Sequence, residues 1–484
     1  MASRTAATIP TSSALAPLSL REKVGYGVGD MASNFYQQFF GIFLLIYYTD
    51  VFGLSPAAAG TMFLATRILD AVTDPAMGMI ADRTQTRWGK YRPYLLWVAV
   101  PYALLGYLLF LGPELGEVGK LVFAYVTYSL VMLAYTAINV PYSALLAVIH
   151  PSAREREKAT QWRFIFASLG SIVVGAVAKP LVDGLGGGDE LLGYRLTVLL
   201  FAVLSVMMFA FVFASTRERI APRRAGGSVG RDIGVLLRNI SWIVLALAGI
   251  SIVVGLIARM SSIAFYLKYY VPSGEDPGLW WMDRTSLLIT LGFVGQLFGA
   301  VLVPTLLRVS DKRSLMIAMT ALNTVLLFSG YFVPADLYWV VLALHMASLF
   351  TFGVMITLLF AMYTDCSEYG EWVSGVNSAG LTVSASMFSL KTGSAIGIAL
   401  PAFILAGFGF EANQAQTPEA IQGIRLMFNL VPAFFFAVAG GLVVLYRLDG
   451  ATVRRIEREL AERRAAEPLA SADTAQPDPT ALPA

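Results

Sequence analysis

Long apolar stretches recur along the whole chain and are separated by short polar segments. Most stretches hold about 20 residues or more, the length that an α-helix needs to cross the roughly 30 Å of hydrocarbon in a bilayer. In lipid the backbone must form its hydrogen bonds internally, so a helix is expected for each stretch. We predict twelve spans, near residues 24–49, 56–81, 92–112, 119–149, 160–186, 194–215, 237–270, 284–307, 313–333, 337–363, 376–409 and 421–447. The pattern therefore predicts an all-α membrane protein.

Basic residues are sorted between the predicted loops. They gather in alternate loops and in the C-terminal segment, at Arg83, Arg87, Lys90, Arg92, Arg154, Arg156, Lys158, Arg217, Arg219, Arg223, Arg224, Arg231, Arg308, Lys312, Arg313, Arg454, Arg455, Arg458, Arg463 and Arg464. An excess of Lys and Arg marks the cytoplasmic side of a membrane protein. Both termini are therefore predicted to lie in the cytoplasm, and an even number of spans gives the same topology.

The longest basic polar interval between spans follows the sixth span. It covers residues 216–236 and divides the chain into two six-helix bundles, at 23–215 and 237–447. Transporters built from two such halves bind their substrate near the middle of the membrane, where the halves meet. The composition of residues 1–22 and 448–484 predicts a disordered cytoplasmic N-terminus and a largely disordered cytoplasmic tail.

Composition agrees with a membrane protein and narrows the function. Hydrophobic residues make up 57% of the 484 residues, and charged residues only 14%. The single cysteine, Cys366, excludes an intramolecular disulfide. The spans contain no glycine-rich ATP loop, metal-ligand cluster or nucleophile pattern, so we expect neither an ATP-driven pump nor an enzyme, and no cofactor. The expected surroundings are the lipid bilayer, with no nucleic acid as partner and a monomer as the functional unit.

Two carboxylates stand inside the second predicted span. Asp70 and Asp74 are four residues apart, which places them on one face of a helix with Cβ atoms about 5–6 Å apart. Like charges in a medium of low dielectric repel each other and lose their hydration, so such a pair is tolerated mainly where a cation or proton neutralises it. We interpret the pair as a cation site. An ion pair with Arg67, one turn earlier, is the structural alternative, and both interpretations can hold together.

Few other polar residues lie at membrane depth. They are Asn34, Thr136, Asn139, Arg163, Arg259 and Lys391. An asparagine offers an acceptor and two donors, which suits a ligand rich in hydroxyl groups, although bonding between helices is an equal alternative. Lys391 lies far from the end of its span, so it needs a carboxylate, a water-filled cavity or a ligand.

Charged residues at the cytoplasmic ends of spans are candidates for a gate. The candidates are Asp82, Arg83, Arg87 and Lys90 after the second span, and Asp365, Glu368 and Glu371 after the tenth. Ion pairs between the basic and acidic segments would close the cytoplasmic side reversibly, as alternating access requires. A merely solvated loop is the equal alternative for the acidic segment.

Several motifs together resemble one family of transporters. They are KVGYGVGDMASNF, YYTDVFGLS, RILDAVTDPAMGMIADRTQTRWGKYRP, NVPYSAL, TDCSEYGEW and SLKTGSA, spread from about Glu22 to Arg458. They look like the glycoside–pentoside–hexuronide:cation symporters, the melibiose-carrier branch of the major facilitator superfamily. The resemblance implies the major facilitator fold and secondary active symport of a sugar with Na⁺ or H⁺ by alternating access in the cell inner membrane.

The resemblance also implies two sets of functional residues. The coupling cation would bind at Asp70, Thr73, Asp74 and Thr136, with Asp70 and Asp74 as metal ligands if the cation is Na⁺. The sugar would contact Asn34, Tyr135, Asn139, Arg163 and Lys391.

Two positions depart from the melibiose carriers, which have aspartates where Asn34 and Asn139 stand here. Glucuronide and xyloside carriers of the family resemble this chain in having asparagines at such points. Two negative charges are lost while Arg163 and Lys391 remain, so we expect an electropositive cavity that favours an acidic sugar. A cation-coupled carrier of a lysolipid or another organic solute on the same scaffold is the alternative function.

Overall fold

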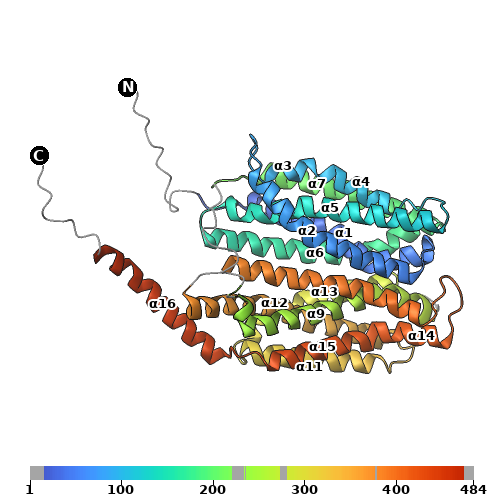
Figure 1. Ribbon diagram of the computed structural model, residues 1–484. Coiled ribbons are helices and arrows are strands. Elements are labelled where there is room, and N and C mark those ends of the chain that lie inside the picture. Colours follow the sequence, from blue (N-terminus) through green and yellow to red (C-terminus); the bar gives the residue numbers. More distant parts are fainter. Residues whose placement is uncertain are drawn as a thin grey trace, which may run out of the picture.

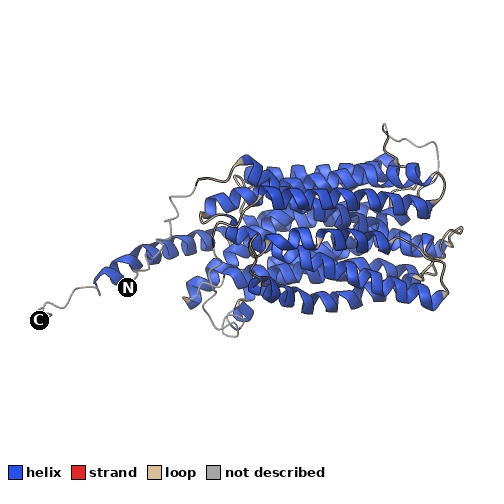
Figure 2. Cartoon of the chain, turned by 90° about the horizontal axis from the view of Figure 1, so that it is seen from above, coloured by secondary structure: helices blue, strands red, loops and turns tan. Residues whose placement is uncertain are grey.

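The computed structural model describes residues 16–220, 234, 236–272, 279, 281–375 and 379–473. Within these residues the chain forms helices and loops, and pairing between extended segments is confined to isolated bridges at Thr86–Gly89 and Leu279–Met282. Figure 2 shows the helices from above. The prediction of an all-α protein is confirmed.

A first group of helices forms one side of the bundle. Its helices are α1 (Leu20–Ile46), the π-helical turn η1 (Tyr47–Val51), α2 (Pro56–Arg83), α3 (Arg92–Trp97), α4 (Ala99–Leu109), α5 (Glu117–Ile149), α6 (Ala153–Gly186) and α7 (Glu190–Ser215). α1 packs against α6 and α7, α2 packs against α5, and α4 packs against α5 and α7. These helices form the upper part of the bundle in Figure 1.

A second group forms the other side. Its helices are α9 (Ile240–Phe265), η2 (Tyr266–Tyr270), α10 (Arg284–Leu306), α11 (Lys312–Gly330), α12 (Tyr338–Ser374), α13 (Ala379–Gly407), α14 (Pro418–Arg425), η3 (Leu426–Leu430) and α15 (Val431–Val444). α9 packs against α13 and α15, and α12 packs against α10 and α11. The two groups meet where α2 contacts α13, α6 contacts α10 and α1 contacts α9.

Ten helices or helix pairs of the described residues are long and apolar enough to cross a membrane. α1 and α2 fall outside this set, although they run side by side with the others in Figure 1. α2 carries Arg67, Asp70 and Asp74 near its middle, and such charges lower the apolar character of a helix. The ten helices with α1 and α2 would make up the predicted twelve spans, and that number stays a prediction. The start of the predicted span 376–409 and most of the predicted central loop lie outside the described residues.

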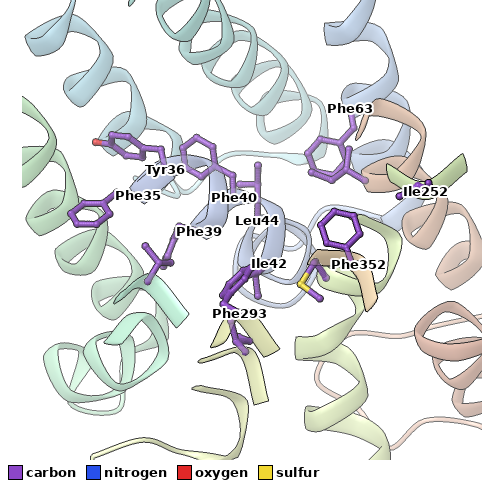
Figure 3. Close-up of a cluster of buried hydrophobic side chains, with 14 of the residues drawn as sticks. Phe35, Tyr36, Phe39, Phe40, Ile42, Leu44, Phe63, Ile252, Phe293 and Phe352 are labelled. Atoms are coloured by element: carbon purple, nitrogen blue, oxygen red, sulfur yellow. The ribbon is translucent and has the colours of Figure 1, made fainter. Parts of the chain in front are cut away.

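α1 separates two kinds of side chain between its two faces. Phe35, Tyr36, Phe39 and Phe40 are buried, and the Phe39 ring lies 5.7 Å from that of Phe201 on α7. Figure 3 shows these α1 rings in one apolar cluster with side chains from both groups of helices. Positions 30, 34 and 38 follow each other at intervals of one turn on the opposite face, and their side chains are only partly buried. The aromatic face therefore anchors α1 and leaves a polar face for other contacts.

The C-terminal segment differs from the prediction of a largely disordered tail. Gly450–Asp473 forms helix α16, which packs against α12 and extends from one end of the bundle in Figure 1. Val453, Ile456 and Leu460 are buried, because their spacing places them on one face of a helix. Charged residues separate these three positions and lower the mean hydropathy of the segment, so the sequence analysis did not identify the apolar face.

Hydrogen bonds hold α16 in place. The carboxylate of Glu459 accepts a hydrogen bond of 2.7 Å from the indole of Trp372 on α12 and another of 2.7 Å from Arg455. The bonds from Arg455 and then Trp372 lower the pKa of Glu459, because both stabilise its ionised form. The charged face of α16 therefore contributes to its attachment.

The loop between α2 and α3 depends on a glycine. Gly89 has φ +107°, a conformation that L side chains rarely adopt. Glu218 lies beside it and accepts hydrogen bonds from the N–H groups of Lys90, Tyr91 and Arg92, at 2.7–3.0 Å, at the start of α3. A Cβ atom at Gly89 would lie only 2.5 Å from the carboxyl carbon of Glu218. A side chain there would both strain the backbone and displace the carboxylate from these donors.

Gly89→Ala is therefore expected to destabilise the protein by about 1–3 kcal/mol. Thermal unfolding of the detergent-solubilised protein should show a midpoint that is lower by several degrees. Gly184→Ala is the matched control, because Gly184 lies in α6 and a Cβ atom there would meet no atom within 4 Å. Equal midpoints for the two variants would contradict the role assigned to Gly89.

Candidate functional site

Asp74 lies where three helices meet. The Thr136 hydroxyl of α5 donates a hydrogen bond of 2.8 Å to Oδ1 of Asp74, and the Lys391 ammonium of α13 pairs with Oδ2. Because α13 belongs to the second group of helices, this ion pair joins the two sides of the bundle. The structure thus gives Lys391 the carboxylate that its position in a span requires, and it brings together three of the predicted site residues.

Asp70 lies one turn before Asp74 and is largely buried. Arg67 Nη1 donates to Asp70 Oδ2 at 3.0 Å, as the structural alternative from the sequence predicted. The two carboxylates are balanced by two cations, Arg67 and Lys391, so the cluster is electrically neutral. The buried hydroxyl of Thr73, another predicted residue, has no hydrogen-bond partner among the described residues. Its oxygen is therefore not used by a hydrogen bond within the described residues.

Polar side chains follow each other at intervals of one turn along the less buried face of α1. We name Asp30, Asn34 and Gln38 the polar ladder. Asn34 Nδ2 donates a hydrogen bond of 2.9 Å to the backbone carbonyl of Asp30, and Gln38 Nε2 donates to Asn34 Oδ1 at 3.4 Å. The Asp30 carboxylate pairs with Arg163 of α6 at 3.1 Å. Asn34 and Arg163 were predicted as sugar contacts, whereas Asp30 and Gln38 were missed. Asp30 stands only a few residues into its span, where an acid is easily taken for part of a polar helix end.

The remaining predicted sugar contacts lie on α5. Asn139 Nδ2 donates to the Tyr135 hydroxyl at 2.8 Å, while Asn139 Oδ1 is buried without a hydrogen-bond partner among the described residues. Arg163 lies over the ring of Tyr142, with 5.1 Å between the guanidinium carbon and the ring centroid. The structure therefore places Arg163 between α1 and α5, and leaves an amide oxygen of Asn139 without a donor.

A cavity of about 180 Å³ lies between the two groups of helices. Its polar lining consists of three amides, a guanidinium and two hydroxyls, from Gln37, Gln38, Gln296, Arg67, Tyr128 and Ser394. Its other lining residues are apolar and come from α1, α5, α9, α10 and α13. Arg67 lines the cavity and pairs with Asp70, and Gln38 lines it and bonds to Asn34. The glutamines were not among the predicted site residues, because sequence alone does not show which face of a span lines a cavity.

Comparison with known proteins shows a match over residues 25–450 to the family described as "MFS/sugar transport protein". The chain belongs to this family. It is therefore a multi-pass membrane transport protein and not an enzyme, as the sequence predicted.

Individual relatives match over nearly the whole chain. A putative glycoside/cation symporter, YagG, of Escherichia coli (strain K12) is 35% identical over 95% of this chain and 98% of its own length. A glucuronide carrier protein homolog from the same organism is 34% identical, over 92% and 96% of the two chains. A crystal structure of a bacterial homolog of the human lysosomal transporter Spinster is similar in fold, with a TM-score of 0.63, 14% identity and coverage of 88% and 95%.

Arg259 of this transporter lies away from the cavity. It is buried within the second group of helices, where Nη1 donates to the Phe428 carbonyl at 2.6 Å and Nε donates to His345 Nδ1 at 3.2 Å. Its guanidinium carbon also lies 4.0 Å from the centroid of the Phe428 ring. These contacts favour a role in packing α9 against α12 and η3.

Four of the predicted gate residues, Asp82, Arg87, Lys90 and Asp365, form contacts within their own group of helices. Asp82 accepts a hydrogen bond of 2.7 Å from the Tyr91 hydroxyl and lies 3.4 Å from Lys90, while Asp365 pairs with Lys312 at 2.7 Å. Burial and then the bond to Asp82 raise the pKa of Tyr91, so its hydroxyl keeps its proton. Arg87 lies over the ring of Trp88. Pairing of Arg83, Arg87 or Lys90 with the acids Glu368 and Glu371 stays a prediction.

A network that the sequence analysis missed joins the groups at the end of the bundle near α14. Asp50 of η1 pairs with Lys268 of η2 at 2.6 Å and also accepts a hydrogen bond from Tyr269. Asn413, in the loop before α14, accepts a hydrogen bond of 2.8 Å from Lys268 and donates one of 2.6 Å to the Asp50 carbonyl. We name Asp50, Lys268, Tyr269 and Asn413 the α14-end latch. Figure 1 places α14 at the end opposite α16.

Proposed function

We propose that this protein is a secondary active transporter that couples the movement of a sugar to that of Na⁺ or H⁺ by alternating access. The observation that carries the proposal is the ion pair of Asp74 with Lys391, because it joins the two groups of helices and Lys391 lies one turn from Ser394, which lines the cavity. A cation that separates Asp74 from Lys391 removes an ion pair between the two groups of helices. Binding of the cation and movement of the two groups of helices are thereby coupled through the Asp74 carboxylate.

The cation site in this proposal consists of Asp70, Thr73, Asp74 and Thr136. Carboxylate and hydroxyl oxygens are the ligands that a hard cation such as Na⁺ prefers. Lys391 neutralises Asp74 in this structure, so an arriving Na⁺ would replace the ammonium, and an arriving proton would remove the negative charge that holds it. Either event weakens the contact of Asp74 with Lys391, which joins the two groups of helices.

The sugar site in this proposal combines the amides of the cavity with the polar ladder of α1. Amides and tyrosine hydroxyls both donate and accept hydrogen bonds, which matches the mixed donors and acceptors of a polyol. The glutamines that line the cavity favour a sugar over the lysolipid of the alternative function, which would need a mainly apolar path. The named relatives give the class of candidates, namely glycosides and glucuronides.

The proposal also includes the predicted placement in the membrane. Both termini would lie in the cytoplasm of a cell whose inner membrane holds the protein, and the α14 end would face outward. Residues 23–215 and 237–447 would move as two bundles around the site, within a single copy of the chain.

Uptake into vesicles tests this function. The purified protein in proteoliposomes is given a panel of radiolabelled hexosides, pentosides and hexuronides, with the Na⁺ gradient and the H⁺ gradient imposed separately. We expect one gradient to drive accumulation of at least one sugar above its external concentration. Transport of lysophosphatidylcholine, with no sugar moved under either gradient, would contradict the proposal and favour the alternative carrier.

A further inference from the structure

The Arg163 guanidinium has a carboxylate partner that sequence comparison with melibiose carriers did not reveal. Asp30 pairs with Arg163 at 3.1 Å, and both side chains are only partly exposed, at 16% and 24%. We propose that Asp30 determines the substrate class by neutralising Arg163, so that the site takes an uncharged sugar in preference to a hexuronide. This inference rests on the proposed function, since it concerns the sugar that the same site binds.

Each of the three cations at the candidate site is matched by one acid. Arg67 pairs with Asp70, Lys391 pairs with Asp74, and Arg163 pairs with Asp30. The expectation of an electropositive cavity counted Arg163 and Lys391 as uncompensated charges. With Asp30 included, the site carries no net charge, and the argument for an acidic sugar loses its basis.

A sugar carboxylate would have to compete for Arg163. Charge-assisted hydrogen bonds between a guanidinium and a carboxylate are roughly twice as strong as neutral ones, and Asp30 already provides such a bond. An incoming hexuronide would lose its hydration and approach Asp30, a like charge, without finding Arg163 free. A neutral sugar meets neither cost, because hydroxyl groups can bond to the pair without separating it.

The position of Asp30 connects it to the sugar site. Its backbone carbonyl accepts the bond from Asn34, whose side-chain oxygen in turn accepts the bond from Gln38 at the cavity. Each of these two amides keeps at least one donor and one acceptor position for sugar hydroxyls. Asp30 is thus a positioning residue that holds Arg163 at the end of a neutral, hydrogen-bonding ladder.

Direct binding of paired sugars tests the inference. The probes are 4-nitrophenyl β-D-glucoside with the β-D-glucuronide, and 4-nitrophenyl β-D-galactoside with the β-D-galacturonide, titrated calorimetrically into the full-length protein in nanodiscs. The wild type should bind the hexoside of a pair at least about tenfold more tightly than the uronide. Asp30→Asn should move that ratio about tenfold or more toward the uronide, because Arg163 is left free. Asp183→Asn, which removes a carboxylate paired with Lys179 at the exposed end of α6, should leave the ratio unchanged.

Further variants separate charge from damage to the fold. Arg163→Gln leaves Asp30 unpaired and should move the ratio further toward the hexoside, whereas the neutral double variant Asp30→Asn/Arg163→Gln should return it close to the wild-type value. A general loss of structure would weaken the binding of both sugars together. The double variant would not restore that binding. The inference is overturned if the wild type prefers the uronide, or if all variants share one ratio. Absence of binding for all four probes would overturn the inference, whereas the proposed function is decided separately by gradient-driven uptake into vesicles.

Discussion

Replacing Asp74 with asparagine is expected to abolish accumulation of sugar against its gradient. Asparagine keeps the shape of the side chain but removes the charge that pairs with Lys391 and would bind the cation. A membrane potential of 100 mV contributes about 2.3 kcal/mol per elementary charge moved, which corresponds to roughly fiftyfold accumulation. Without coupling, the concentration ratio across the vesicle membrane should fall to about one, while exchange down the gradient continues in part.

The measurement is concentrative uptake into vesicles, with the amount of protein in the membrane determined for each variant. Asp70→Asn should give the same loss, because Asp70 and Asp74 would share the cation. Lys179→Gln is the matched control, since it removes an ammonium–carboxylate pair with Asp183 within α6 and outside the candidate site. Normal accumulation in both aspartate variants would show that the acid pair is structural only.

The membrane fold could be predicted from the sequence because lipid leaves few choices. A long apolar stretch must form a helix in order to satisfy its own backbone, so the order of the helices followed from hydropathy alone. The same reasoning predicted that Lys391 would need a carboxylate, a water-filled cavity or a ligand at membrane depth, and the structure shows a carboxylate. It did not predict that the carboxylate would be Asp74, since hydropathy gives the span of each residue but not the direction in which its side chain points.

The missed residues share a physical cause. Asp50 and Glu218 lie near the ends of helices, and Asp30 lies near the start of its predicted span, where charged residues are common and do not by themselves indicate a function. Their importance comes from partners more than 100 positions away in the chain, such as Lys268 for Asp50. A local sequence pattern does not show which residues distant in the chain are in contact. The packing of helices decides it, and the structure was therefore needed to find the α14-end latch and the neutral charge of the site.

The α14-end latch combines ion pairing with hydrogen bonds between the two groups of helices. The Asp50 carboxylate is almost completely buried, with 1% of its side chain exposed, whereas Lys268 keeps 33%. A buried acid that loses its cationic partner is strongly destabilised, although partial exposure of the lysine reduces the effect. The closed arrangement at this end therefore depends on Asp50 keeping its charge and its partner.

Asp50→Asn is expected to shift the transporter toward a form that is open at the α14 end. Loss of the ion pair should cost the closed form roughly 1–2 kcal/mol, which is about a tenfold change in the ratio of the two forms. Ala264 is a suitable reporter position, because it lines the cavity of about 240 Å³ that also includes Asp50 and Lys268. In a Cys366→Ser background, a cysteine introduced by Ala264→Cys should react about tenfold faster with a charged thiol reagent once Asp50 is changed.

A charge exchange distinguishes the latch from a general loosening of the helices. Lys268→Asp alone should expose the reporter cysteine as Asp50→Asn does, because two acids then face each other. Asp50→Lys combined with Lys268→Asp restores an ion pair across the same interface and should restore slow labelling. Lys179 also lines this cavity, but its ion pair with Asp183 lies within α6, so Lys179→Gln should have no effect. Fast labelling in the exchanged variant, or slow labelling in Asp50→Asn, would mean that the two groups are held together at this end by apolar packing instead.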